Sequence, residues 1–140
     1  MTTEINNELR GADGDVLAKE AAKILIEKLA LDVTMYSVAE HTSITDYYVN
    51  ATGRSHSHVA ALADEVAENF EKRGMGPYRT EGKKGNSWIL VDFGALIVNI
   101  FDSEGRNFYS FDRLLPAESK DNIDDLIKEI DDKFNIDKKD

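Results

Sequence analysis

The carboxylates of Asp92 and Asp102 are the side chains of this chain best placed to hold a metal for phosphoryl transfer, because each follows or ends a predicted strand. Two acids spaced Asp-x-Asp point to the same face of a strand and can share a magnesium ion. Asp92 is followed by Phe93 and Gly94, so the second acid of such a pair is missing. Asp102 could approach it only from the end of the next strand. We therefore expect no metal, no cofactor and no enzymatic activity.

Histidine chemistry has weaker support. His56 and His58 are two residues apart, which places them on different sides of a helix rather than at the i, i+4 spacing that binds zinc. A solvated start of a helix is the simpler interpretation. His41 lies near Ser43 and Asp46, but proximity in sequence does not make a catalytic triad. The chain has no cysteine, which excludes disulfides, thiolate catalysis and cysteine zinc sites.

The apolar segment 87–101 indicates a binding surface instead, since it reads as two adjacent strands joined at Gly94. Strand side chains alternate between faces, so Trp88, Leu90 and Asp92 share one face of the first strand. In the second strand Leu96, Val98 and Ile100 alternate with Ile97, Asn99 and Phe101. Both faces are largely apolar, which predicts that both are covered.

The elements that must position this segment follow from hydrophobic periodicity. A helix capped by Asp15 precedes strands at about 32–38 and 46–52. A second helix, capped by Ser55 or Ser57, follows, with one apolar stripe: Val59, Leu62, Ala63, Val66 and Phe70. A short strand at 78–81 comes before segment 87–101. We predict a single α/β (α+β) domain with a mixed, roughly five-stranded sheet packed by helices.

The C-terminal part of the chain is predicted to be helical. Between residues 103 and 115 a turn and a short helix carry Phe108, Phe111, Leu114 and Leu115, which could close the open end of the sheet. Beyond Pro116, residues 116–140 form an acidic amphipathic extension whose apolar stripe either packs on the domain or binds a partner. The expected organisation is a flexible N-terminus at 1–14, a domain at 15–115 and the extension at 116–140.

Several segments together resemble the ribosomal silencing factor family, RsfS, also called Iojap-like. The likeness rests on an ordered set of segments: 44–55 (ITDYYVNATGRS), 63–66 (ADEV), Glu81-Gly82, 87–101 (SWILVDFGALIVNIF) and 106–109 (RNFY). It covers roughly residues 17 to 115. No short motif among them is diagnostic alone.

The resemblance implies a binding protein that docks on the large ribosomal subunit, chiefly on large-subunit protein fourteen, and sterically prevents the small subunit from joining. Within this surface we expect Trp88, Leu90 and Asp92, with Glu81 and Tyr109 as further members. Aromatic and aliphatic groups would supply buried area, and the two acids would pair with arginine or lysine on a basic partner. The alternatives are a core anchor for Trp88, a turn hydrogen bond for Asp92 and core packing for Tyr109.

The resemblance also implies a fold related to nucleotidyltransferases, whose pattern begins with a Gly-Ser turn that Gly53-Arg54-Ser55 superficially resembles. Two other functions therefore stay open, a residual nucleotidyltransferase-like enzyme and a generic protein-binding adaptor. Ala95, Asn99 and Leu115 depart from the usual family pattern, in which Asp, His and Trp are common at these positions. A homodimer is a further expectation from the family.

Charge and hydropathy limit the partners. The net charge is −10, with about −2 in residues 1–30, −4 in 31–115 and −4 in 116–140. Phosphate backbones repel such a protein, so we expect no extensive nucleic-acid binding, whereas basic ribosomal proteins would be attracted. No run reaches the roughly 18 apolar residues that span a bilayer, and the start lacks a signal sequence. The expected location is cytoplasmic, without a membrane partner.

Overall fold

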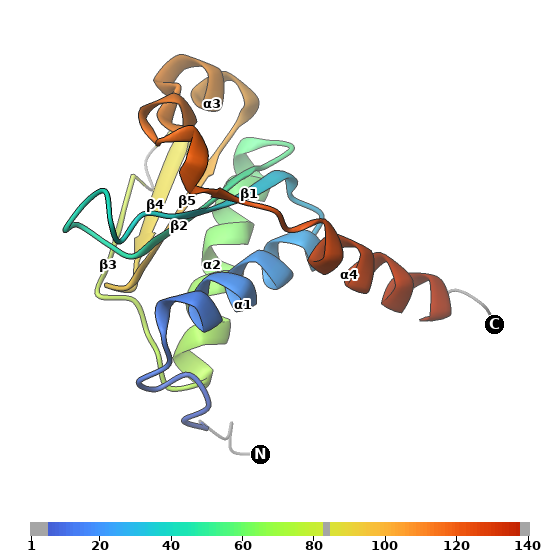
Figure 1. Ribbon diagram of the computed structural model, residues 1–140. Coiled ribbons are helices and arrows are strands. Elements are labelled where there is room, and N and C mark those ends of the chain that lie inside the picture. Colours follow the sequence, from blue (N-terminus) through green and yellow to red (C-terminus); the bar gives the residue numbers. More distant parts are fainter. Residues whose placement is uncertain (1–5, 83–84, 138–140) are drawn as a thin grey trace.

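The computed structural model describes residues 6–82 and 85–137, and side chains as far as residue 133. Figure 1 shows helices packed around one twisted sheet. The elements in chain order are α1 (Gly14–Glu27), β1 (Leu31–Ser37), β2 (Tyr47–Thr52), α2 (His56–Lys72), β3 (Arg79–Glu81), β4 (Trp88–Asp92), β5 (Leu96–Phe101), α3 (Ser103–Tyr109), the 3-10 helices η1 (Phe111–Leu114) and η2 (Ala117–Ser119), β6 (Lys120–Asp121) and α4 (Asp124–Asp137).

The sheet is mixed, as predicted. Within the described residues six strands follow the order β3-β4-β5-β2-β1-β6. The central pair β2 and β5 is parallel, and the other neighbours are antiparallel. The order of one helix, two strands, one helix and three strands is confirmed. The sheet has one strand more than the roughly five expected, because the two-residue β6 pairs with the edge strand β1.

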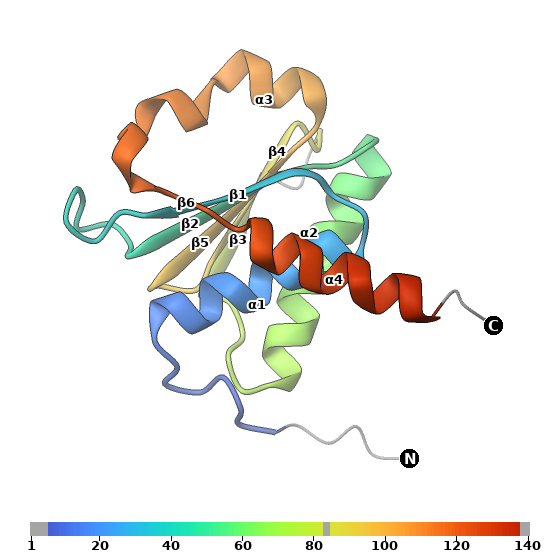
Figure 2. The same cartoon turned by 45° about the vertical axis from the view of Figure 1, so that its right-hand side comes forward.

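One face of the sheet carries the main core. Buried side chains from β2, β4 and β5 pack there against α1 and α2, and include Val49, Val91, Val98 and Ile100. The predicted stripe of α2 is buried in full, which confirms the helical period. Figure 2 shows α1, α2 and α4 on this side of the sheet and α3 on the other.

Local signals fix the starts of the two long helices differently. Ser55 caps α2, since its hydroxyl accepts a hydrogen bond from the backbone N–H of His58 at 3.1 Å. The cap predicted for α1 is wrong, because Asp15 lies inside the first turn and Asp13 precedes the helix without a side-chain cap. An acid in the first turn still stabilises the positive end of the helix dipole.

Residues 6–13 and the first half of α4 pack against the domain. Residues 6–13, placed by the sequence in a flexible N-terminus, run beside the end of α2, where Leu9 is buried and its N–H bonds the carbonyl of Arg73 at 2.8 Å. At the other end, Ile130 of α4 is buried, and Ile123 and Leu126 pack on the core. Of the helices in the described part of the chain, none has the length and apolar character needed to cross a membrane.

Candidate functional site

The second face of the sheet, which we call the α3 face, carries the side chains singled out in the sequence. Strand register places Thr34 and Tyr36, Tyr48, Asn50 and Thr52, Ile97, Asn99 and Phe101, and Trp88, Leu90 and Asp92 on this face. Segment 103–115 arches over it (Figure 2). Phe111 and Leu115 pack from that segment onto the strands.

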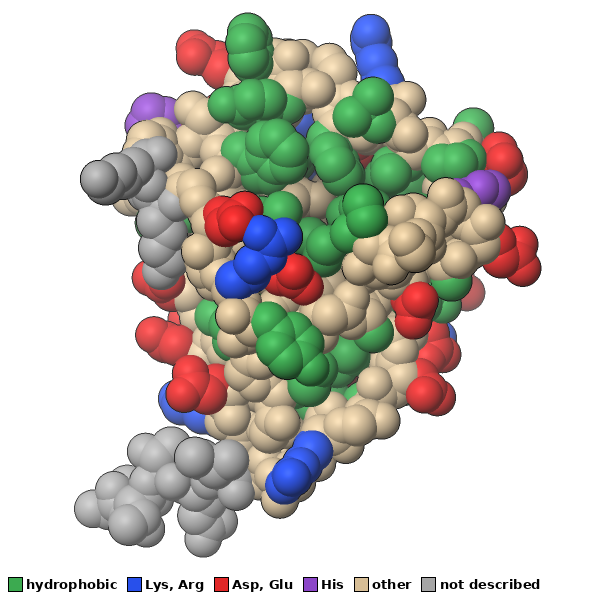
Figure 3. Space-filling view, turned by 90° about the vertical axis from the view of Figure 1, so that its left-hand side faces the viewer, with side chains coloured by type: hydrophobic (Ala, Val, Ile, Leu, Met, Phe, Trp, Pro, Cys, Tyr) green, Lys and Arg blue, Asp and Glu red, His purple; other side chains and the backbone are tan. Residues whose placement is uncertain are grey.

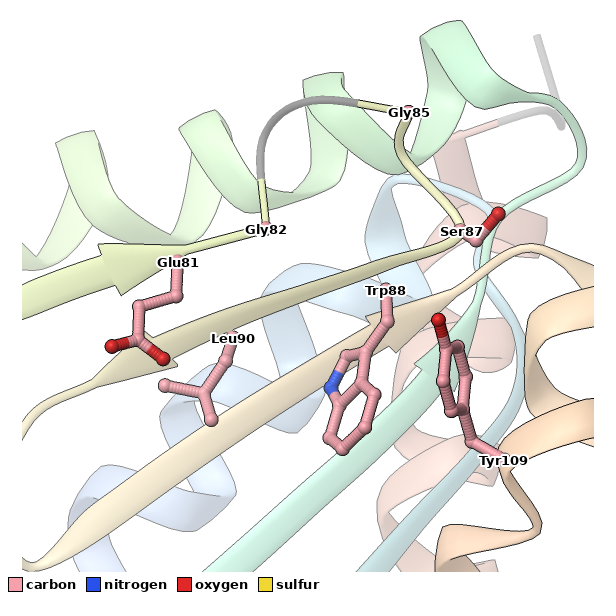
Figure 4. A pocket seen from close by; sticks show the side chains of 7 residues that line it. All are labelled: Glu81, Gly82, Gly85, Ser87, Trp88, Leu90 and Tyr109. Carbon is pink, nitrogen blue, oxygen red and sulfur yellow. The ribbon is translucent and has the colours of Figure 1, made fainter.

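A pocket opens beside the single tryptophan. Its volume is about 430 Å³, and its walls come from Glu81, Gly82, Gly85, Ser87, Trp88, Leu90 and Tyr109. In Figure 4 Glu81 and Leu90 lie on one side of Trp88 and Tyr109 on the other. Glu81 pairs with Leu90 in the register of β3 and β4, so both side chains face the same way. Four of the five predicted site residues therefore line one pocket.

An aromatic cluster surrounds Trp88 at this site. The ring centroid of Trp88 lies 4.9 Å from that of Tyr109, 5.2 Å from that of Phe101 and 5.6 Å from that of Phe111. These tilted contacts connect β4 and β5 to α3 and η1. Phe101 is fully buried, whereas Tyr109 is 43% exposed. Trp88 is thus both an anchor for the covering segment and a wall of the pocket.

Arg79 of the same chain contacts both acids that the sequence assigned to the site, Asp92 and Glu81. The Nε of Arg79 donates to Oδ2 of Asp92 at 3.1 Å, and its Nη1 pairs with Oε1 of Glu81. The other oxygen of Asp92 accepts from the backbone N–H of Gly94 at 2.8 Å, which fixes the turn between β4 and β5. The turn role considered for Asp92 is present. Glu81 keeps more freedom, because its side chain is 57% exposed against 19% for Asp92.

Beneath the pocket, Trp88 is held by a chain of hydrogen bonds through buried amides. Its indole N–H donates to Oδ1 of Asn99 at 2.9 Å, and Asn99 in turn donates to Oδ1 of Asn50 at 3.0 Å. The amide of Asn50 donates to Oδ2 of Asp112 at 3.3 Å. Both asparagines are fully buried and are partners in the parallel register of β2 and β5. The orientation of Trp88 therefore depends on groups two strands away.

This series of hydrogen bonds ends at the ion pair between Arg106 and Asp112, which ties segment 103–115 to the sheet. Nε and Nη2 of Arg106 donate to the two oxygens of Asp112 at 3.1 and 3.0 Å. Arg106 also donates to the hydroxyls of Thr34 and Thr52, both at 3.0 Å. The hydroxyl of Tyr36 donates to Asp112 at 2.7 Å. A bidentate geometry with several further donors makes this a strong, well-oriented pair.

Titration behaviour reflects this arrangement. Burial alone would raise the pKa of Asp112, but hydrogen bonds from Arg106, Tyr36 and Asn50 and the charge of Arg106 outweigh it and hold the pKa below its ordinary value. Burial, with the hydrogen bond to Asp112 and its negative charge, raises the pKa of Tyr36 to about 12. Asp112 is therefore ionised and Tyr36 protonated at neutral pH.

The covering segment itself exposes apolar side chains. Phe108 is 81% and Leu114 76% exposed, next to the partly exposed Tyr109. Figure 3 shows hydrophobic side chains gathered over the upper part of one face of the molecule. The expectation that all four apolar residues of segment 103–115 close the sheet is therefore half wrong. Phe111 and Leu115 pack inward, while Phe108 and Leu114 point to solvent because the backbone turns at Ser110, whose φ is +50°.

Comparison with known proteins places the chain in a family. Residues 12–140 match the family described as "Ribosomal silencing factor during starvation", RsfS. The chain belongs to this family. It is 32% identical over 102 residues to the ribosomal silencing factor RsfS of Zymomonas mobilis, covering 73% of this chain and 77% of that protein. It is 35% identical over 83 residues to RsfS of Haemophilus influenzae, covering 59% of this chain and 81% of that protein.

Solved structures agree with the assignment. A crystal structure of a protein from Chromobacterium violaceum matches with a TM-score of 0.69 and 27% identity, covering 71% of this chain and 83% of that one. A crystal structure from Bacillus halodurans matches with a TM-score of 0.63 and 25% identity, covering 76% and 94%. A mouse relative, 29% identical over 70% of this chain and 44% of its own length, is named "Mitochondrial assembly of ribosomal large subunit protein 1".

Within the RsfS fold, the residues that could have formed a nucleotidyltransferase site lie apart. Asp92 ends β4 and Asp102 follows β5, and because these strands are antiparallel the two acids lie at opposite ends of the pair, roughly 17 Å apart along the strands. Asp102 instead caps α3 at Gly105 and pairs with His56 at 2.7 Å. The described residues include no group of three or more acids or histidines that could hold a metal.

The histidine at 58 also has a structural role that sequence reasoning missed. Its Nδ1 accepts from the backbone N–H of Arg54 at 2.9 Å, and its Nε2 lies 2.9 Å from the carbonyl of Lys28. The start of α2 is solvated as expected, and the half-buried His58 also ties it to the end of α1. Asn99, one of the departures from the family pattern, is fully buried and accepts a hydrogen bond from the indole of Trp88.

Proposed function

We propose that this protein binds the large ribosomal subunit through large-subunit protein fourteen and thereby blocks joining of the small subunit. It would act as a cytoplasmic repressor of translation without a catalytic step. The observation that carries the proposal is the α3 face, where one pocket, an aromatic cluster and exposed apolar side chains occur together. Membership of the RsfS family supports the choice of the ribosome as the partner.

The exposed apolar side chains on this face suit a protein partner. Contiguous exposed apolar surface on a folded domain commonly marks an interaction site. Binding energy at such sites concentrates on a few aromatic and arginine anchors near the centre. Trp88 and Tyr109 would be such anchors, with Phe108 and Leu114 adding buried area around them. A generic adaptor would use the same surface, so the identity of the partner has to come from experiment.

Charge favours a basic protein over ribosomal RNA. The chain carries −10, and Glu81 and Asp92 lie at the edge of the proposed site. Such a surface is repelled by phosphates and attracted to a basic protein, chiefly through the association rate. The charge therefore favours association with a basic ribosomal protein over association with ribosomal RNA.

Steric exclusion converts this binding into silencing. A factor that binds only the free large subunit shifts the joining equilibrium by RT ln(1 + [L]/Kd), about 2.7 kcal/mol when its free concentration is 100 times Kd. That shift reduces joining about a hundredfold and needs no chemical reaction. The separation of Asp92 from Asp102 weighs against the enzyme alternative.

The extension at residues 116–140 adds little support to the predicted homodimer. Ile123, just before α4, and Leu126 within it pack on the core, and Ile130 is buried, whereas Ile127 is only partly buried. Most of the described stripe is thus covered by the same chain, so it lends little support to self-association. Dimerisation stays a prediction.

Cosedimentation with purified subunits tests the proposed binding. The wild-type protein should travel with the large subunit and not with the small one. Trp88→Ala should lose most of this binding while keeping a cooperative urea transition, because it removes the centre of the aromatic cluster. Leu29→Ala is the matched control, since it truncates an apolar side chain that is 62% exposed in the loop after α1. Binding that survives Trp88→Ala unchanged would contradict the site.

A further inference from the structure

The pocket beside Trp88 has walls of two kinds. Trp88, Leu90 and Tyr109 supply apolar and aromatic surface, and Glu81 supplies a carboxylate at one side. Ser87 adds a hydroxyl. None of the described residues that line the pocket is a lysine or an arginine. A ligand that matches these walls has an apolar stem and a positively charged head.

We propose that this pocket takes one arginine side chain of the partner, with its stem over Leu90 and Trp88 and its guanidinium at Glu81. The inference rests on the proposed function and specifies how the ribosomal partner is recognised. Figure 4 shows the four side chains in the order Glu81, Leu90, Trp88 and Tyr109 along the pocket.

Strand geometry gives this row a suitable length. Glu81 and Leu90 are directly opposed in the antiparallel pair β3–β4, and Trp88 is the diagonal neighbour of Glu81. Diagonal neighbours are about 7–8 Å apart between Cα atoms, within reach of one long side chain. Arginine buries its methylene groups on apolar surface while its charged head stays at the rim. The row is therefore as long as the side chain that it would hold.

The carboxylate of Glu81 favours arginine over lysine. A guanidinium is planar and forms two parallel hydrogen bonds to one carboxylate. Lysine offers a single point charge that is more strongly hydrated. Trp88 supplies apolar surface for the stem, and its ring is held against Tyr109 with the centroids 4.9 Å apart.

The carboxylate of Glu81 is available despite its contact with Arg79. Among the described residues one guanidinium there serves two carboxylates, which leaves one negative charge in excess. Asp92 is the better enclosed of the two and also binds the backbone of Gly94, so Arg79 stays with Asp92 when Glu81 turns toward a partner. Glu81 is more than half exposed, and among the described residues its ion-pair partner is Arg79.

The test is large-subunit binding by Glu81→Gln, which keeps the shape of the side chain and removes its charge. We expect binding to weaken roughly tenfold or more, because a charge-assisted bidentate hydrogen bond is lost. Glu118→Gln is the matched control, since Glu118 is an exposed acid in η2, away from the lining of the pocket. Urea unfolding of both variants should match the wild type.

Arginine-to-lysine substitutions in purified large-subunit protein fourteen then identify the occupant. One of them should weaken binding to the wild type, and its effect should largely disappear against Glu81→Gln. Unchanged binding of Glu81→Gln, or coupling of Glu81 only to a lysine, would overturn the arginine assignment while leaving the proposed function standing. A wild-type protein that fails to bind the large subunit would instead refute the proposed function itself.

Discussion

Replacing Asp112 by asparagine should destabilise the protein far more than removing Arg79, although both side chains belong to Arg–Asp pairs on the same face. Asp112 accepts hydrogen bonds from Arg106, Tyr36, Thr34 and Asn50. The side chains of Arg106 and Asp112 are only 15% and 25% exposed. Asp112→Asn would leave the guanidinium of Arg106 enclosed without its counter-charge.

The expected cost follows from this enclosure. Breaking a fully buried pair costs about 3–5 kcal/mol, and the remaining exposure of Asp112 reduces this to about 2–3 kcal/mol. Arg79 is 51% exposed, so solvent screens its ion pairs and Arg79→Met should destabilise the protein much less. Because Asp112 has a lowered pKa, the advantage of the wild type is present above about pH 4 and is lost as the pH falls further through the folded-state pKa.

Urea unfolding followed by the fluorescence of Trp88, the only tryptophan, measures both variants. With m of about 1–3 kcal/mol/M, Asp112→Asn should lower the midpoint by roughly 1 M or more at pH 7, and Arg79→Met should lower it clearly less. A midpoint for Asp112→Asn within 0.3 M of the wild type, on the order of 0.5 kcal/mol, would refute the role given to this pair. So would equal effects of the two substitutions.

Three further predictions test the same face. The stability of the wild type should fall between about pH 10 and about pH 12, because the unfolded state loses a tyrosine proton that folded Tyr36 retains. Urea midpoints measured across this pH range should show a smaller fall for Tyr36→Phe. Gly82→Ala should lower the free energy of unfolding by about 3 kcal/mol or more, because its Cβ would lie 2.1 Å from the carbonyl oxygen of Trp88. Gly85→Ala, at the same φ of +86°, meets nothing within 4 Å and should cost about 1–2 kcal/mol. Equal urea midpoints of the two variants would contradict this. Asn99→Leu should increase the motion of the Trp88 ring, which lowers its fluorescence anisotropy, and should weaken large-subunit binding. Unchanged anisotropy would show that the amide of Asn99 does not orient the indole.

The faces of the sheet were predictable because strand alternation has a period of two. In segment 87–101 that period placed Trp88, Leu90 and Asp92 together, and the register of β4 with β3 and β5 confirms it. The α2 stripe was predictable for the same kind of reason, with a helical period. Such patterns are local, so a single sequence is enough to read them.

Contacts that depend on pairing between distant strands were not predictable. The bond between Asn50 and Asn99 exists only because β2 and β5 pair in parallel with these residues in register. The short β6 carries no strand signal of its own and forms because it meets the edge of β1. The exposure of Phe108 depends on the turn at Ser110, which interrupts the helical spacing expected for segment 103–115.

Subunit joining tests the central claim most directly. Purified large and small subunits are mixed at a magnesium concentration that supports joining, with the wild-type protein, Trp88→Ala or Leu29→Ala, and joined ribosomes are resolved on a sucrose gradient. We expect the wild type and Leu29→Ala to travel with the large subunit and to reduce the joined peak, and Trp88→Ala to do neither. A joined peak that is unchanged by excess wild-type protein would contradict the account.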